Sequence, residues 1–187
     1  MCPMSEDYLL KTKTVWENCQ KHLEVFQKSS SEIQKESPIE SVQNYLTQHL
    51  LIVLCAEVEE QICGFLSERA EKAKDPAIKA LVDSWAKRVI RSVGYEELIG
   101  IIKIFGKGYK EKFESLIDEG SKAYYSIVVK GRHNVAHYSE SQSQVTMKEF
   151  EKGLKSAEEI LIAFRKTLNP SISSSPPNLP PSNAYSA

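Results

Sequence analysis

The stretch that decides the fold class is residues 37–73, SPIESVQNYLTQHLLIVLCAEVEEQICGFLSERAEKA. It opens with a helix-start pattern, because Ser37 can cap a helix, Pro38 suits the first turn and Glu40 can bond back to the cap. The run 50–56 is apolar on all sides, which predicts a helix enclosed by other helices. Apolar residues recur along the whole stretch at the spacing of one helix face: Ile39, Val42, Leu46, Leu50, Val53, Val58, Ile62 and Phe65.

The same spacing continues on both sides of this stretch. Residues 123–129 (AYYSIVV) have the composition of a strand, but no second strand is visible to pair with them, so a helix is predicted there too. Thr146 and Glu149 form a second capping pattern before the last helix, which Asn169-Pro170 ends. The fold predicted is an all-α bundle of about five to seven helices. The further helices expected are 6–28, 75–94, 95–105, 109–119 and 146–168, with a loop at 106–108. Asp75-Pro76 repeats the capping pattern at the start of the helix 75–94.

Three parts of the chain are predicted from these patterns. Residues 1–36 hold the first helix and a linker, packed on the core, and residues 37–168 form the helical domain. Residues 169–187 are rich in Pro and Ser and almost lack large apolar side chains. Such a segment cannot bury enough surface to order itself, so a disordered C-terminal tail is predicted.

Composition limits the class of protein. The 187 residues carry a net charge of −1, so no global positive field would attract a polyanion, and RNA would have to bind a local patch or the joint surface of a dimer. The four cysteines include no CxxC pair, no signal peptide is visible, and the longest apolar run, 50–56, is too short to cross a bilayer. A cytoplasmic protein with no membrane contact is expected.

Residues 130–138, KGRHNVAHY, gather the groups that RNA cleavage without a metal needs. A base must take the proton of a ribose 2′-OH, and an acid must protonate the leaving 5′ oxygen. Histidine suits both roles because its pKa lies near neutrality. Arginine keeps its charge and its fork matches phosphate oxygens. Arg132 and His137 are therefore the catalytic candidates.

The spacing of this segment, Arg132-x4-His137 with the polar His133 directly after the arginine, resembles the signature of the HEPN family. The order of elements is similar to RiboL-PSP-type HEPN domains over about residues 40–166. The resemblance implies a helical bundle that forms a homodimer, in which two motifs share one composite cleft. It also implies a metal-independent endoribonuclease, often of a toxin–antitoxin or antiphage system, whose products end in a 2′,3′-cyclic phosphate and a 5′-hydroxyl.

Roles of the remaining motif residues follow from the resemblance. His133 and Asn134 would position the substrate; alternatively, His133 is catalytic or merely exposed to solvent, and Asn134 forms a cap. Tyr138 would help to position the substrate, although one HEPN subgroup has its tyrosine one position later. An acid after the apolar run can hold the arginine or histidine in such a bundle, and Glu57 is the favoured one over Glu59 and Glu60, although a solvated face is the plainer interpretation.

The helical geometry of the motif sets a condition on how Arg132 and His137 can share one cleft. Residues 133 and 137 share a face of a regular helix, whereas residues 132 and 137 lie about 140° apart. Arg132 and His137 can reach one cleft only if Arg132 sits at a helix end or if two chains share the cleft. Gly131 indicates a kink or a helix start at this point.

Other functions remain open on the sequence. His133 and His137 could be half of a metal site, but the motif supplies Arg132 in place of further ligands and HExxH is absent, so neither a metal nor another cofactor is expected. The main alternative is a non-catalytic HEPN module that binds RNA, a nucleotide or a protein partner. A plain helical interaction protein is the third possibility. An antitoxin or regulatory protein is an expected partner of the nuclease.

Overall fold

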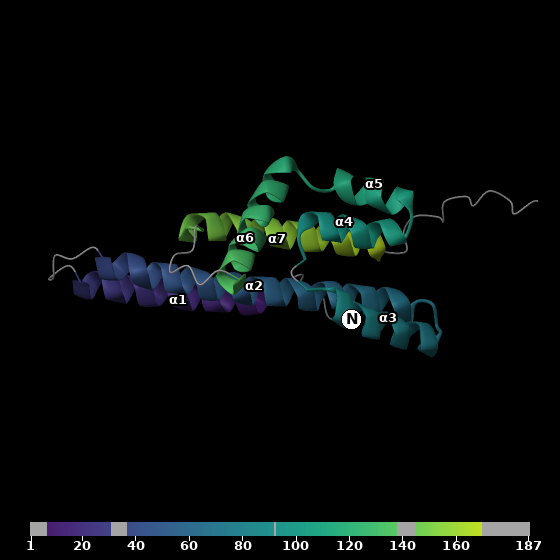
Figure 1. Ribbon diagram of the computed structural model, residues 1–187, viewed down its shortest axis with the longest axis horizontal. Helices are drawn as coiled ribbons and strands as arrows, with labels where there is room; N and C mark the ends of the chain where they lie inside the picture. Colours follow the sequence, from purple (N-terminus) through teal and green to yellow (C-terminus); the bar gives the residue numbers. More distant parts are fainter. Residues whose placement is uncertain (1–6, 31–36, 92, 138–144, 170–187) are drawn as a thin grey trace, which may run out of the picture.

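The computed structural model describes residues 7–30, 37–91, 93–137 and 145–169. In these ranges every regular element is a helix, which confirms the all-α prediction and its upper estimate of the helix number (Figure 1). The predicted tail from residue 170 onward lies outside the described residues. The helices are α1 (Leu10–Ser30), α2 (Ser37–Glu71), α3 (Pro76–Val89), α4 (Tyr95–Ile104), α5 (Lys107–Ser115), α6 (Glu119–His137) and α7 (Met147–Leu168).

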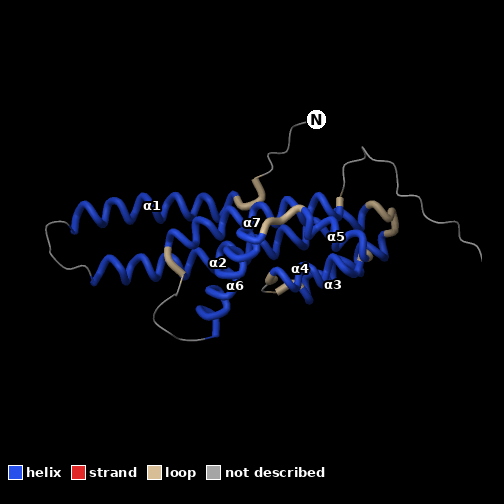
Figure 2. Tube along the Cα trace, turned by 90° about the horizontal axis from the view of Figure 1, so that it is seen from above, coloured by secondary structure: helices blue, strands red, loops and turns tan. Residues whose placement is uncertain are grey.

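Helix α2 is the spine of the molecule. It contacts α1 along its first half and α3 along its second, and α6 and α7 pack on it as well. Figures 1 and 2 show α1 and α2 side by side as a long hairpin, while α6 crosses over the middle of α2. Enclosure is incomplete, because Ile52 in the apolar run is 48% exposed on the side that no helix covers. The prediction that this run is buried on all sides was wrong at Ile52 and at Ala56, which is also exposed.

Aromatic rings connect the helices through the core. Phe164 of α7 lies 6.4 Å from Phe65 of α2 and 6.0 Å from Phe113 of α5, measured between ring centroids. Tyr8 packs edge-on against Phe65 at 5.3 Å, and Tyr95 of α4 stacks on Phe113 at 6.0 Å. Five segments of the chain therefore meet in one apolar core, which gives the short helices α4 and α5 a fixed place beside α6.

Capping side chains set two helix starts as predicted. Asp75 accepts from the backbone N–H of Ala77 and Ile78 at the start of α3, at 2.8 and 3.3 Å. Thr146 and Glu149 form the reciprocal capping box of α7. These side chains satisfy N–H groups that have no partner inside a helix.

Two helix ends differ from the predicted positions. α3 ends at Val89 rather than near residue 94, because Ile90 adopts an extended conformation and Ile90 and Val93 turn into the core. α5 begins at Lys107, so the predicted loop 106–108 shrinks to one sharp turn at Gly106, whose φ of 118° favours glycine. α5 also ends at Ser115, four residues before the predicted 119.

Residues 123–129 lie inside α6, as predicted from the lack of a partner strand. The helix continues through Gly131 and the whole described part of the motif. Gly131 therefore marks neither a kink nor a helix start, and Arg132 does not sit at a helix end. No helix of the described ranges has the length and apolarity to cross a membrane.

Candidate functional site

Two glycines fix the position of α6, which carries the motif. A Cβ at Gly153 of α7 would lie 2.0 Å from Val128 Cγ2 of α6. A Cβ at Gly131 would lie 2.5 Å from Val145 Cγ2, just before α7, and 3.2 Å from Leu51 Cδ1 of α2. Both residues are buried, and only glycine lets the neighbouring helices approach this closely. The role of Gly131 is thus close packing of the motif helix against Val145 and α2.

Arg132 is half-buried on the side of α6 that faces α2. Its charge acts on the thiol of Cys55 in α2: burial raises the pKa of Cys55 to about 12, the Arg132 guanidinium opposes this rise and the Glu59 carboxylate adds to it. Arg132 and Glu59 therefore both lie near this buried thiol. The Cys55 thiol stays protonated at neutral pH and is a poor nucleophile.

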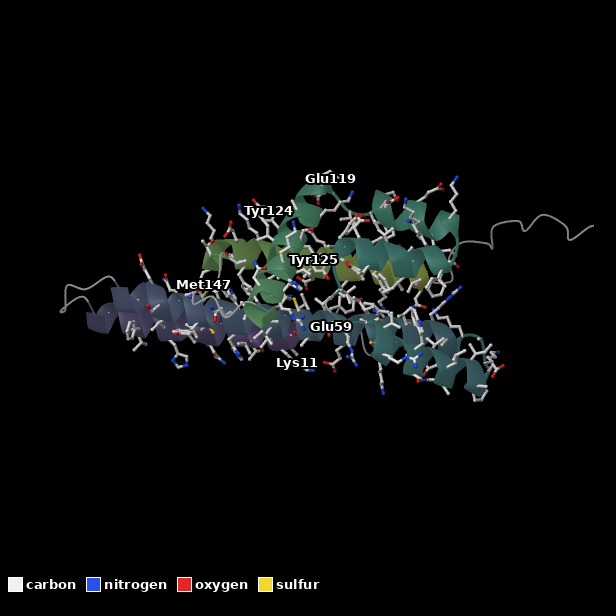
Figure 3. The ribbon with its side chains drawn as sticks, viewed as in Figure 1. Lys11, Glu59, Glu119, Tyr124, Tyr125 and Met147 are labelled. Atoms are coloured by element: carbon white, nitrogen blue, oxygen red, sulfur yellow. The ribbon has the colours of Figure 1, made fainter. Side chains whose placement is uncertain are left out.

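Glu59 also lies close to Tyr125 of α6. Burial, together with negative charge that includes Glu59, raises the pKa of Tyr125 well above its usual value, so this phenol stays neutral. Its hydroxyl donates to the carbonyl oxygen of Val93 at 2.6 Å. Figure 3 shows Glu59 and Tyr125 where α6 crosses α2. A half-buried carboxylate and a half-buried guanidinium thus both lie near Cys55 at this crossing.

His133 and Asn134 lie on another side of α6. Both line a groove of about 800 Å³ between α4, α5 and α6, with His133 exposed and Asn134 half-buried. Arg132, by contrast, is not among the groove residues. The motif therefore serves two surfaces: its arginine lies at the α2 crossing, and the two residues after it face the groove.

His137 is the last residue of α6 in the described range, one turn after His133. The side chain of His137 and the whole of Tyr138 lie outside the described residues. Because α6 is one regular helix from 132 to 137, the backbone places these two positions on different sides of it, about 140° apart. The condition for a common cleft within one chain, an arginine at a helix end, is not met.

Glu57, the acid favoured from the sequence, faces α1 instead of the motif. Its carboxylate accepts three hydrogen bonds from the first turn of α1: from the Lys11 N–H at 3.0 Å, the Thr12 N–H at 2.8 Å and the Thr12 hydroxyl at 2.7 Å. The side chain is buried, and its bonds cap the helix where N–H groups lack partners. Glu57 holds α1 on α2.

The acid that faces α6 is Glu59, which the sequence reasoning named but placed behind Glu57. Two positions on a helix differ by about 200°, so these acids occupy nearly opposite faces. The signal that could have selected Glu59 is its spacing of four from Cys55, which puts both on the side that meets α6. Choosing the correct face needs the position of α1, which the sequence does not give.

No three His, Cys, Asp or Glu side chains in the described part of the chain gather as a metal site would require. Comparison with curated proteins and with solved structures found no match. The family model described as RiboL-PSP-HEPN matches residues 17–170. The match begins inside α1, earlier than the predicted limit near residue 40, and runs through α7. Because it covers well over half of the sequence, the chain belongs to the RiboL-PSP-HEPN family.

Proposed function

We propose that this protein is a metal-independent endoribonuclease that works as a homodimer. HEPN domains are often RNases, and they commonly dimerise and bind RNA. The observation that carries the proposal is the placement of the half-buried Arg132 near the Cys55 thiol that Glu59 also approaches, with His133 and Asn134, the next two residues of α6, facing an open groove. A half-buried cation is suited to binding a phosphate that arrives from solvent.

Arg132 binds the scissile phosphate in this proposal, and Glu59 orients its guanidinium. A carboxylate on the far side of an arginine fixes the direction of the fork and leaves the remaining N–H groups for phosphate oxygens. Glu59 takes the role that the sequence had suggested for Glu57. It is a positioning residue, because it acts on the RNA only through Arg132.

His137 is the general acid and base, paired with its twin in the second protomer. One imidazole takes the proton of the ribose 2′-OH, whose oxygen attacks the adjacent phosphorus. The bond from phosphorus to the 5′ oxygen breaks, and the other, protonated imidazole donates its proton to that oxygen. The products are a 2′,3′-cyclic phosphate and a 5′-hydroxyl, and no metal is required. His133, Asn134 and Tyr138 position the strand.

A dimer brings Arg132 and His137 to one cleft although they lie on different sides of α6. Positions 132 and 137 lie about 140° apart on one regular helix, so one chain cannot present both side chains to the same phosphate from adjacent directions. Two antiparallel copies of the helix can, because Arg132 of one chain then approaches His137 of the other. Size-exclusion chromatography with light scattering is expected to show a homodimer.

The proposed biological setting is a toxin–antitoxin or antiphage system in the cytoplasm. A nuclease of this kind needs control, so an antitoxin or regulatory protein is a proposed partner. Co-expression gives the readout: growth arrest on expression of the wild type, none with Arg132→Ala, and recovery when the partner is supplied.

The biochemical test is cleavage of total cellular RNA and tRNA by the purified protein in EDTA. Arg132→Ala and His137→Ala are compared with the wild type, and His22→Ala, an exposed histidine of α1, is the matched control. Loss of cutting in the two motif variants alone supports the nuclease. RNA binding without cutting by the wild type would favour the non-catalytic module, a possibility that the near-neutral net charge keeps in view.

A further inference from the structure

The groove between α4, α5 and α6 is large enough for a small ligand and is lined by charged side chains. Its volume of about 800 Å³ falls in the range of roughly 300–1,000 Å³ that is typical of ligand sites. α4 contributes Glu96 and Lys103, α5 contributes Lys110, and α6 contributes Lys130 and His133. Neither the motif chemistry nor packing requires this collection of charges, because these residues lie around an opening rather than in the core.

Some of the charges in the groove are already neutralised within it. Lys110 pairs with Glu114 at 3.5 Å, and Lys122 pairs with Glu119 at 2.5 Å. Lys130, by contrast, is exposed and has no ion-pair or hydrogen-bond partner among the described residues. This ammonium group stands one turn before His133 on the same side of α6, so a phosphate bound to it would lie next to the motif.

The facing side of the groove is acidic. Glu96 and Glu97 line it from the first turn of α4, and the carboxylate of Glu97 lies 2.5 Å from the point where a Cβ on Gly94 would stand. A ligand that fits both sides carries an anionic group and, several ångströms away, N–H donors. A nucleotide has this pattern, because its phosphate suits the lysine and its base offers N–H groups to carboxylates.

We propose that the groove holds a nucleotide of the single-stranded RNA substrate away from the scissile bond, with Lys130 on a backbone phosphate and the base between α4 and α6. This inference rests on the proposed nuclease, since it assigns the groove to the same substrate. A strand is favoured over a free nucleotide because Lys130 and His133 are both exposed and adjacent, so the chain of phosphates can leave the groove along α6 toward the motif.

The test is binding of a fluorescent, fully 2′-O-methylated RNA oligonucleotide, which cannot be cut by 2′-OH attack. Lys130→Gln is expected to weaken binding about threefold or more at low salt and to lower the slope of log K against log salt by about 0.7, the value of one single-strand phosphate contact. Lys107→Gln is the matched control, because this α5 lysine is 89% exposed and lies outside the groove. It should leave both quantities unchanged.

A second variant tests the space itself without a change of charge. Ala123 is exposed on α6 and lines the groove, so Ala123→Trp should fill it while the helix still forms. Binding of the oligonucleotide is expected to fall by about tenfold. Thermal melting of each variant confirms that it is folded.

The outcomes separate this inference from the proposed function. If cleavage depends on Arg132 but Lys130→Gln and Ala123→Trp bind the oligonucleotide as tightly as the wild type, the proposal for the groove is wrong and the proposed nuclease is kept. If both variants bind the oligonucleotide more weakly but the wild type does not cleave RNA, the groove is an RNA-binding site and the proposed nuclease activity is wrong. Saturable binding of free mononucleotides that Ala123→Trp abolishes, with no affinity for the oligonucleotide, would overturn the assignment to RNA.

Discussion

Glu57 and Glu59 stand two residues apart on α2 and lie in different environments. Glu57 is buried under α1, where its carboxylate accepts three hydrogen bonds, all at 3.0 Å or less. Glu59 is half-buried on the other side of the helix, close to Cys55 and Tyr125, at the crossing that also holds Arg132. The contrast teaches that two acids in one turn of a helix can face different neighbours, one buried under α1 and the other half-buried toward α6.

Removing the Glu57 carboxylate should have the largest effect on stability. Glu57→Ala leaves the N–H groups of Lys11 and Thr12 without partners beneath α1, and the free energy of unfolding is expected to fall by about 3 kcal/mol. Urea denaturation followed by circular dichroism measures this. Glu60→Ala is the control: its salt bridge with Lys11 is exposed on both sides, so the change should stay below about 1 kcal/mol. Equal losses of stability in Glu57→Ala and Glu60→Ala would contradict the view that the buried carboxylate holds α1 on α2.

The packing of α6 on α7 gives the next effect. Gly153→Ala would place a methyl group 2.0 Å from Val128 Cγ2 and 3.3 Å from the Tyr124 carbonyl, so the helices must separate, at a cost of about 2 kcal/mol. Gly64→Ala is the matched control in α2, where a Cβ meets nothing within 4 Å. It should stabilise the protein by about 0.5–1 kcal/mol, because alanine loses less chain entropy in a helix. Thermal melting of the two variants should shift in opposite directions.

Glu59→Gln sharpens the comparison from the functional side. The substitution keeps the shape of the side chain but removes the charge that we propose orients Arg132, so RNA cleavage is expected to slow about tenfold, equivalent to about 1.4 kcal/mol. Stability should change by less than about 1 kcal/mol, because Glu59 is only half-buried. A lower kcat, measured at saturating RNA, together with an unchanged KM would fit a role in positioning. Normal cleavage together with marked unfolding would make Glu59 a second structural acid.

The capping box of α7 should give the smallest effect, and one that depends on pH. Hydrogen bonds from the Thr146 backbone and side chain lower the pKa of Glu149 below its ordinary value of 4.5. A carboxyl group whose pKa is lower in the folded state stabilises the fold above its unfolded pKa, and this contribution is lost as the pH falls through the folded value. Glu149→Gln should therefore melt earlier than the wild type at pH 7, with the difference shrinking below about pH 4.5. A difference independent of pH would contradict this account.

Local patterns predicted the helices well because most of the information lies in neighbouring residues. The caps at Asp75 and Thr146 and the apolar spacing of α2 and α7 require only the helix itself. The sequence predicted later ends for α3 and α5 than the observed Val89 and Ser115. α3 stops early because Ile90 and Val93 turn into a core that distant helices build.

The surroundings of the candidate residues could be predicted from the sequence only in part, and the reason is again physical. The sequence indicated the segment from Arg132 to Tyr138, but not that Arg132 and His133 serve different surfaces of α6. Gly131 looked like a break in the helix, whereas the close approach of Val145 and of Leu51 in α2 explains it. Which face of a helix meets which neighbour depends on packing over the whole chain, so the choice between Glu57 and Glu59 needed the structure.

The chemistry of the RNA ends tests the central claim most directly. Purified protein is incubated with a defined RNA in EDTA, and the new ends are identified by mass spectrometry, with Arg132→Ala beside the wild type. A metal-independent nuclease of this mechanism leaves a 2′,3′-cyclic phosphate and a 5′-hydroxyl, and none with the variant. RNA that stays intact in EDTA, or that is cut only with added Mg²⁺ to leave a 5′-phosphate, would contradict the claim.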